Sequence, residues 1–281
     1  MVNLPLPVSI NLPAGADALS AEDWLALQDA WQRLEMMPLT ARLTGVIGRR
    51  LDDASLILPE RLRDIARKAT TSALTAAMKT SLKSLQHHER PPSPRLHQAL
   101  AVASGAAGGA FGLVSLPLEL PVSTVILLRS IADIARAQGE DLSHPDAALA
   151  CIEVFAIGSH AKDDDFLSSS YFAMRALLAR SISEATQYVA ASTAASQSAP
   201  VILRLLNQIA ARFGVAVTQK AMAQAVPLLG AAGGAAINYA FTQHFQSLAT
   251  GHFTMRRLER KYGEELIRTH YNSIQATDRN K

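Results

Sequence analysis

One hexapeptide, Gly-Ala-Ala-Gly-Gly-Ala, occurs twice in this chain, at Gly105–Ala110 and at Gly230–Ala235. Each copy lies in a long stretch without a charged residue, 99–118 and 221–243. Two glycines in each copy are four residues apart, and positions four apart share one face of a helix. Because small residues on one face let a second helix approach closely, the repeat predicts two Gly-rich helices in tight contact. Each glycine inside a helix costs about 1 kcal/mol relative to alanine, a cost that such packing would have to offset.

Both uncharged stretches have the length of a membrane-spanning helix, about 20 residues. They are rich in alanine and glycine, carry polar side chains such as Ser104 and Gln224, and lack the aromatic belts found at bilayer surfaces. Three interpretations stay open: buried helices of a soluble core, a hairpin that associates with a membrane, and a permanent span. The composition favours the first, and we expect a peripheral rather than an integral relationship to any membrane.

Apolar side chains recur at helical spacing along most of the chain. The first series, from Trp24 to Leu34, follows Ser20, a good N-cap residue with Asp23 three positions on, close to a capping box. We find no run of alternating apolar and polar residues of the kind that forms half-buried strands. The sequence therefore predicts an all-α fold, a multi-helix bundle around two closely packed Gly-rich helices, with Gly139 as a helix stop.

Proline content and periodicity divide the chain. The prolines of the first residues favour an extended arm, and the proline-rich segment 87–95 is the clearest break. We expect an N-terminal arm over 1–18, a helical region over 19–86, a helical core over 96–270 that forms one domain with the preceding helices, and a polar tail over 271–281.

Charge and cysteine content exclude some classes of protein. The net charge of +3 is too small to indicate a nucleic-acid binder. The N-terminal residues lack the basic and apolar regions of a secretory signal, so we expect a cytoplasmic protein. The single cysteine, Cys151, lies in an apolar segment and is expected to be a buried small side chain rather than a nucleophile.

The common catalytic and cofactor motifs do not occur in the sequence. We find no phosphate-binding loop, no H-E-x-x-H pair and no G-x-S-x-G elbow. We therefore expect no cofactor and favour a non-enzymatic role. His160 with Asp163, Asp164 and Asp165 is a weak candidate for a divalent cation site, but acidic residues also stabilise a helix N-terminus without any metal.

Three charged residues stand out in an otherwise apolar region: Glu119, Arg129 and Asp133. Arg129 and Asp133 are one helical turn apart and can pair. A buried Glu119 requires a partner, for which Arg129 is the candidate. The three residues form either a structural ion-pair cluster or a ligand-binding or catalytic site.

Four segments in their order resemble the EcsC family of bacteria. They are GGAFGLVSLPLELP, LRSIADIARAQGED, PLLGAAGGAAINYAFTQHF and FTMRRLERKYG, within a resemblance that runs from about Trp31 to Tyr262. The family carries a Gly-rich stretch with an acidic residue between prolines, an arginine-containing helix, a Gly-Ala helix ending in asparagine, and a terminal arginine segment. By position these residues correspond to Glu119, Arg129, Asn238, and Arg257 or Arg256.

The resemblance implies a context of ABC transport and protein secretion, and some family members carry a peptidase label. Our first hypothesis is a non-enzymatic helical protein that binds at the inner membrane or to a membrane-protein partner. Two alternatives stay open. One is a hydrolase with a site near Glu119, Arg129 and Asp133, and the other is a lipid-binding or membrane-inserting helical protein. Ligand-binding candidates are Glu119, Arg129, Asp133 and Asn238.

Overall fold

The structure is a computed structural model that describes residues 19–35, 38–48, 60–84, 99–100, 102–103, 116–158, 171–191, 199–224 and 230–279. Within these ranges the chain is helical and contains no strand, which confirms the predicted all-α class. The helices are α1 (Ala21–Glu35), α2 (Leu39–Ile47), α3 (Glu60–Ser84), α5 (Leu116–Ala137), α6 (Pro145–Ile157), α7 (Tyr171–Ala191), α8 (Pro200–Gln224), α9 (Gly230–Tyr262) and α10 (Glu264–Arg279).

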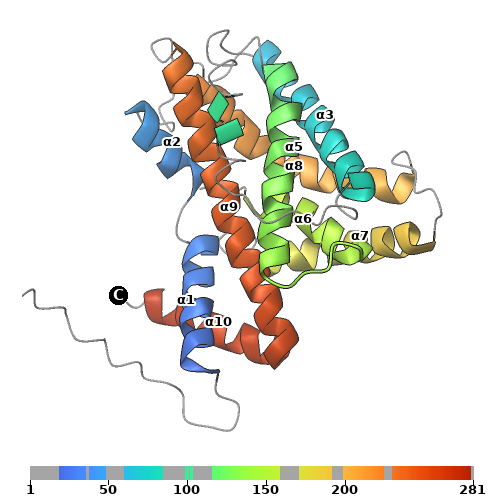
Figure 1. The fold of residues 1–281 in the computed structure, drawn as a ribbon. Coiled ribbons are helices and arrows are strands. Elements are labelled where there is room, and N and C mark those ends of the chain that lie inside the picture. Colours follow the sequence, from blue (N-terminus) through green and yellow to red (C-terminus); the bar gives the residue numbers. More distant parts are fainter. Residues whose placement is uncertain are drawn as a thin grey trace, which may run out of the picture.

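Helix α9 is the long axis of the molecule. It runs from one end to the other, with α5 beside it and α1 against its lower half (Figure 1). Its apolar side chains Ile237, Phe241, Phe245 and Leu248 recur every three or four residues and are all buried. Because this spacing keeps them on one side of the helix, α9 can pack on several partners along its length.

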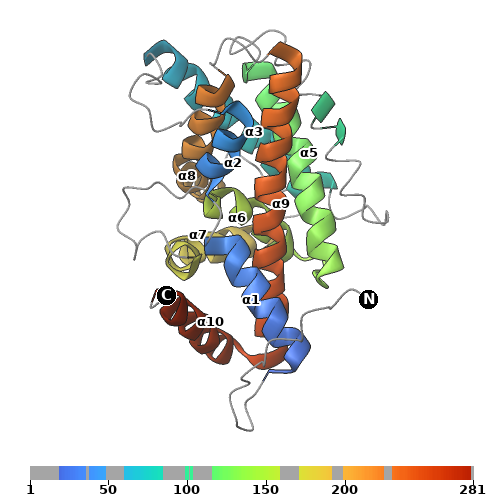
Figure 2. The ribbon, with the colours of Figure 1, turned by 90° about the vertical axis from the view of Figure 1, so that its left-hand side faces the viewer.

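Helix α6 lies in the middle of the bundle, beside α9 (Figure 2). Pro145 occupies its first turn, where a missing N–H costs nothing, and every residue from Ala147 to Ile157 is buried. Cys151 is among them, as expected from its apolar neighbours. A left-handed Gly139, with φ of 81°, ends α5 and allows the chain to turn into α6, as the sequence predicts.

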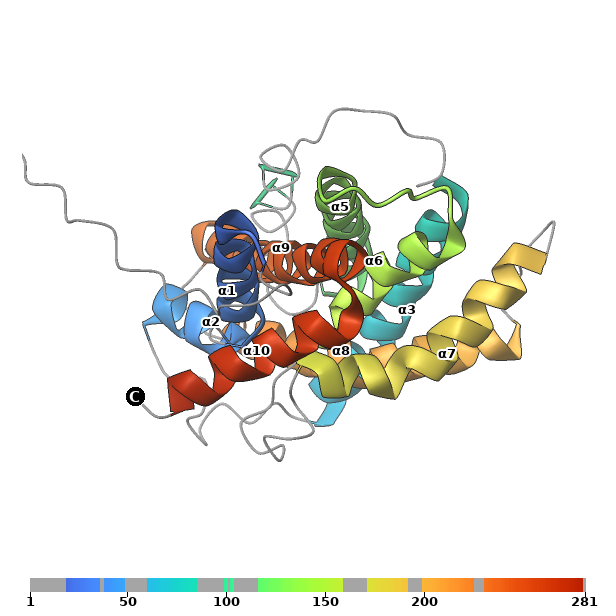
Figure 3. The same cartoon turned by 90° about the horizontal axis from the view of Figure 1, so that it is seen from below.

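The lower end of the molecule joins the two ends of the described chain. The Asp23 N–H donates to the Ser20 hydroxyl at 3.2 Å, so the expected cap starts α1. Asp23 also accepts hydrogen bonds from Arg257 and Lys261 of α9, at 3.0 and 2.6 Å. Viewed from below, α10 crosses under α1 (Figure 3). The helix continues to Arg279, through most of the expected polar tail.

Several predicted features lie outside the described residues: the arm 1–18, the proline-rich break 87–95 and the first Gly-rich copy. The second copy opens α9, and its Gly233 and Gly234 are buried. Contact between the two copies therefore stays a prediction.

Candidate functional site

A buried ion pair joins α5 to α8. The ammonium group of Lys220 donates to Oε1 of Glu119 at 2.8 Å, and the two side chains are 0% and 4% exposed. Glu119 lies in the first turn of α5, and Lys220 lies near the C-terminal end of α8. Glu119 therefore sits at the helix end whose dipole favours a negative charge.

Two amides and one ring complete this cluster, which we name the Glu119 cluster. Asn238 of α9 donates to Oε1 of Glu119 at 2.8 Å, and Gln224 of α8 donates to Oε2 at 3.3 Å. The ammonium of Lys220 also lies 4.9 Å from the centre of the Phe241 ring, a cation–π contact. Three helices thus meet at one carboxylate.

The Glu119 carboxylate is held in its charged form. Burial alone would raise its pKa, but the charge of Lys220 and the hydrogen bonds from Lys220, Asn238 and Gln224 keep the pKa below its usual range. A carboxylate that accepts from three donors is a poor general base at neutral pH, because its proton affinity is low. The geometry is that of a structural junction.

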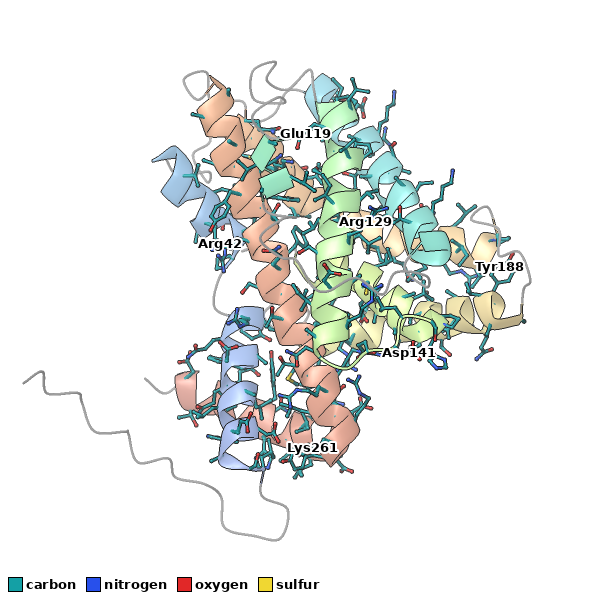
Figure 4. All side chains as sticks on the ribbon, viewed as in Figure 1. Arg42, Glu119, Arg129, Asp141, Tyr188 and Lys261 are labelled. Atoms are coloured by element: carbon teal, nitrogen blue, oxygen red, sulfur yellow. The ribbon has the colours of Figure 1, made fainter. Side chains whose placement is uncertain are left out.

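The expected pair between Glu119 and Arg129 is wrong. Arg129 is exposed ten residues further along α5, a rise of about 15 Å, and Figure 4 shows the two residues well apart. The possible pair between Arg129 and Asp133 is not among the ion pairs of the described residues, and the Asp133 carboxylate instead contacts Arg136 at 3.2 Å. The structure therefore brings Glu119 and Asn238 together but places Arg129 and Asp133 elsewhere. Whether any of the four binds a ligand stays a prediction.

Sequence reasoning missed Lys220, although a signal was present. The apolar stripe of α8 includes Ile209, Phe213 and Val217, all buried. Lys220 is the next position of that stripe. A lysine in an apolar register indicates a buried cation that needs a buried anion.

A second buried polar cluster, which we name the His252 cluster, lies between α6, α7 and α9. Nδ1 of His252 lies 3.1 Å from the Tyr171 hydroxyl, and Nε2 lies 3.8 Å from a carboxylate oxygen of Glu153. All three side chains are buried. Burial raises the pKa of Glu153 to about 7. Burial, assisted by the charges of Arg175 and Arg256, lowers the pKa of His252 well below its ordinary value.

The terminal arginines act as cross-links. Arg256 donates to Glu140 at 2.8 Å and to Asp146 at 2.7 Å, which ties α9 to the turn between α5 and α6. Arg257 donates to Asp23 of α1 and to Gln138. The guanidinium groups of Arg256 and Arg257 therefore both bind other residues of this protein.

The metal candidates His160, Asp163, Asp164 and Asp165 lie outside the described residues. Among the residues that the structure does describe, no group of three His, Cys, Asp or Glu side chains is placed to hold a metal ion.

An open groove of about 1390 Å³ runs between α3 and α8. Cations line its α3 side, at Arg63, Arg67, Lys68 and Lys79. Mostly small residues line its α8 side, together with the longer polar side chains of Asn207 and Gln219. The sequence analysis did not identify this groove, because the two walls are more than 100 residues apart in the chain. The charged side chains that line it are all cations, and it faces solvent.

These features define an all-α protein built on one long helix, with buried polar clusters at its helix junctions and a basic groove on its surface. The chain belongs to the EcsC protein family, whose match covers residues 31–258. That range includes both buried clusters, and it confirms the resemblance seen in the sequence. No curated protein and no solved structure matches the chain.

Proposed function

We propose that this protein acts by binding rather than by catalysis, and that it binds at the surface of the inner membrane from the cytoplasmic side. One observation carries the proposal, the exposure of α8. Over an 18-residue window of α8 the mean hydropathy is 1.3, yet only 39% of that window is buried. Among the described residues this is the one helix long and apolar enough to cross a bilayer.

Core helices of soluble proteins reach the same hydropathy, but they are mostly buried. In α8 the partly or fully exposed positions include Leu203, Ala211 and Val215. Apolar surface of this kind gains free energy when it leaves water for the boundary between lipid headgroups and acyl chains.

The charges beside α8 favour the same partner. The exposed side of α3 carries Arg63, Arg67, Lys68 and Lys79. Cations next to an anionic leaflet contribute about 1 kcal/mol each, and this contribution is screened by salt. Apolar surface flanked by cations is the combination found in peripheral membrane proteins.

Vesicle flotation tests the proposal. We expect purified protein to float with vesicles that contain anionic phospholipid and to be released as salt is raised. In cells we expect alkaline carbonate to extract it from the membrane fraction. Failure to float with any vesicle would refute membrane-surface binding. Sedimentation with native membranes alone would point to a membrane-protein partner, and retention after carbonate treatment would make the protein integral.

A further inference from the structure

We infer that the groove between α3 and α8 holds a single anionic phospholipid, with the phosphate-bearing headgroup against the α3 cations and an acyl chain along the small residues of α8. The inference rests on the membrane binding proposed above, and it adds a defined site and a ligand class to it.

The positively charged side chains of α3 determine which end of the groove binds the headgroup. Arg63, Arg67 and Lys68 lie within about one and a half turns of α3, on the side that lines the groove. Arg67 shares its charge with the exposed Asp64 at 3.0 Å, whereas Lys68 forms no ion pair with another described residue. Guanidinium and ammonium groups clustered in this way are the usual partners of phosphate.

The middle of the groove combines apolar surface with a few polar side chains, among them Asn207 and Gln219 of α8. The hydroxyl of Thr71 donates to the Arg67 carbonyl at 3.2 Å, and that of Thr75 donates to the Thr71 carbonyl at 2.8 Å. On the opposite wall stand Ala211 and Gly214. With its hydroxyl protons used within the helix, this surface presents mainly methyl and methylene groups, against which a hydrocarbon chain can lie.

Size and lining select a lipid over other anions. Pockets for small molecules measure roughly 300–1,000 Å³, and this groove, at about 1390 Å³, is larger. The cations at its ends, Arg63 and Lys79, are sixteen residues apart, which corresponds to about 24 Å of helix. No aromatic side chain lines the groove, so it lacks the stacking platforms of single-stranded nucleic-acid sites.

Gly214 provides a test by steric block. A Cβ built at this position meets no atom within 4 Å, and Gly214 lines the groove, so a side chain there would begin in open space at the groove wall. We therefore choose Gly214→Trp as the blocking variant. Gly45 of α2 is the matched control, because a Cβ there also meets nothing within 4 Å and Gly45 is not part of the groove.

The measurement is native mass spectrometry of full-length protein in detergent, titrated with phosphatidylglycerol. We expect wild type and Gly45→Trp to bind one lipid each, and Gly214→Trp to bind about tenfold more weakly or worse. Equal binding by Gly214→Trp and wild type would overturn the inference. Thermal melting checks that both variants are folded.

Charge variants test the headgroup end. Arg67→Gln/Lys68→Gln should weaken phosphatidylglycerol binding roughly 10- to 30-fold. Arg129→Gln/Arg180→Gln, which removes the same charge from exposed positions of α5 and α7, should change it little. Equal loss in the two double variants would mean that only net charge matters, and the defined site would be wrong.

Different probes test separately how the groove binds the headgroup and how it binds the acyl chain of the lipid. Phosphatidylcholine and uncharged diacylglycerol should bind less tightly than phosphatidylglycerol, and inorganic phosphate should not displace the bound lipid. Displacement by phosphate alone would refute the acyl-chain half. A protein that floats with vesicles but binds no lipid in detergent would refute the groove and leave membrane binding intact. Lipid binding in detergent without flotation would support the groove and refute binding to the membrane surface.

Discussion

Nζ of Lys220 lies 2.8 Å from Oε1 of Glu119, and neither side chain has more than 4% of its surface exposed. The two residues are 101 positions apart in the chain and come from different helices. Because water is excluded from both charges, each is tolerated only in the presence of the other. The pair therefore fixes how α5 and α8 meet.

Removing one member of this pair should cost more than removing both. We expect Lys220→Met and Glu119→Gln each to lower the free energy of unfolding by about 3–5 kcal/mol, because single removal leaves a buried group without its partner. Glu119→Gln/Lys220→Met should lose clearly less than the sum of the single losses. Urea unfolding in a double-mutant cycle measures this, and additive losses would show that the pair is not coupled.

The His252 cluster makes stability depend on pH in two opposing ways. The pKa of Glu153 is about 7 when folded, against an ordinary 4.5, so between these pH values the folded protein holds a proton that the unfolded chain has released. The Glu153 contribution to stability therefore falls as pH rises through this window. The pKa of His252 lies well below 6.5 when folded, so its contribution falls as pH drops below 6.5.

Single variants should separate the two contributions. Between pH 5 and 6.5, each has a slope of up to ~1.4 kcal/mol per pH unit. Relative to wild type, Glu153→Gln should make stability rise with pH, because His252 is left unopposed. His252→Gln should make it fall with pH. Guanidinium unfolding across this range gives the slopes. The exposed Glu265→Gln serves as the control, and parallel pH profiles for all four proteins would contradict the assignment.

At Gly251, α1 packs closely against α9. A Cβ at this position would lie 2.9 Å from Cγ of Leu34 and 3.1 Å from the Ala30 carbonyl oxygen. We expect Gly251→Ala to lower stability by about 1–3 kcal/mol through overpacking. Gly214→Ala, with open space around it, should raise stability by up to about 1 kcal/mol through helix propensity. Midpoints of urea unfolding that shift in the same direction would refute this contrast.

Cys151 should be unreactive in the native protein. Burial, with a further contribution from the charge of Glu140, raises the pKa of its thiol to about 12, so almost no thiolate is present at pH 8. A chromogenic disulfide reagent should label no thiol in the folded protein and one per chain in denaturant. Rapid labelling of native protein would show that the site opens.

The Gly-rich repeat carries a prediction that is still to be tested. Gly234 is buried in α9, and the close packing expected of the repeat implies that leucine cannot be accommodated there. Gly234→Leu should lower stability by about 1–3 kcal/mol. An unchanged or higher unfolding midpoint would show that the position does not need a small residue.

Local signals predicted the fold better than they predicted the site. The Ser20 cap, the Gly139 stop and the apolar spacing of α9 depend on neighbours within one or two turns, so the sequence shows them directly. Glu119 was recognised as a charge in an apolar region, but its partner was sought nearby, at Arg129. The true partner comes from another helix, and no rule of local spacing connects the two.

The same limit applies to small residues. The repeat drew attention to glycines four apart, but close helix approaches also occur at single glycines outside it, such as Gly251. His252 resembles Lys220 in this respect, since it continues the buried series Phe241, Phe245 and Leu248 of α9. The signal available in the sequence was a polar residue at a helix position where the pattern calls for an apolar one. This signal would have located both buried clusters.

The contact between α1 and α9 joins two segments that are synthesised at well-separated times during translation. Asp23 and its partner Arg257 are 234 residues apart, and α1 packs mainly on α9 and α10. At about 5–20 residues per second, synthesis takes on the order of 10 to 50 s to bridge that distance. Throughout this interval the nascent chain presents the apolar side of α1, with Leu27, Trp31 and Leu34, to the surrounding medium. Helix α1 can therefore reach its native packing only after α9 has been synthesised, however early α1 itself becomes helical.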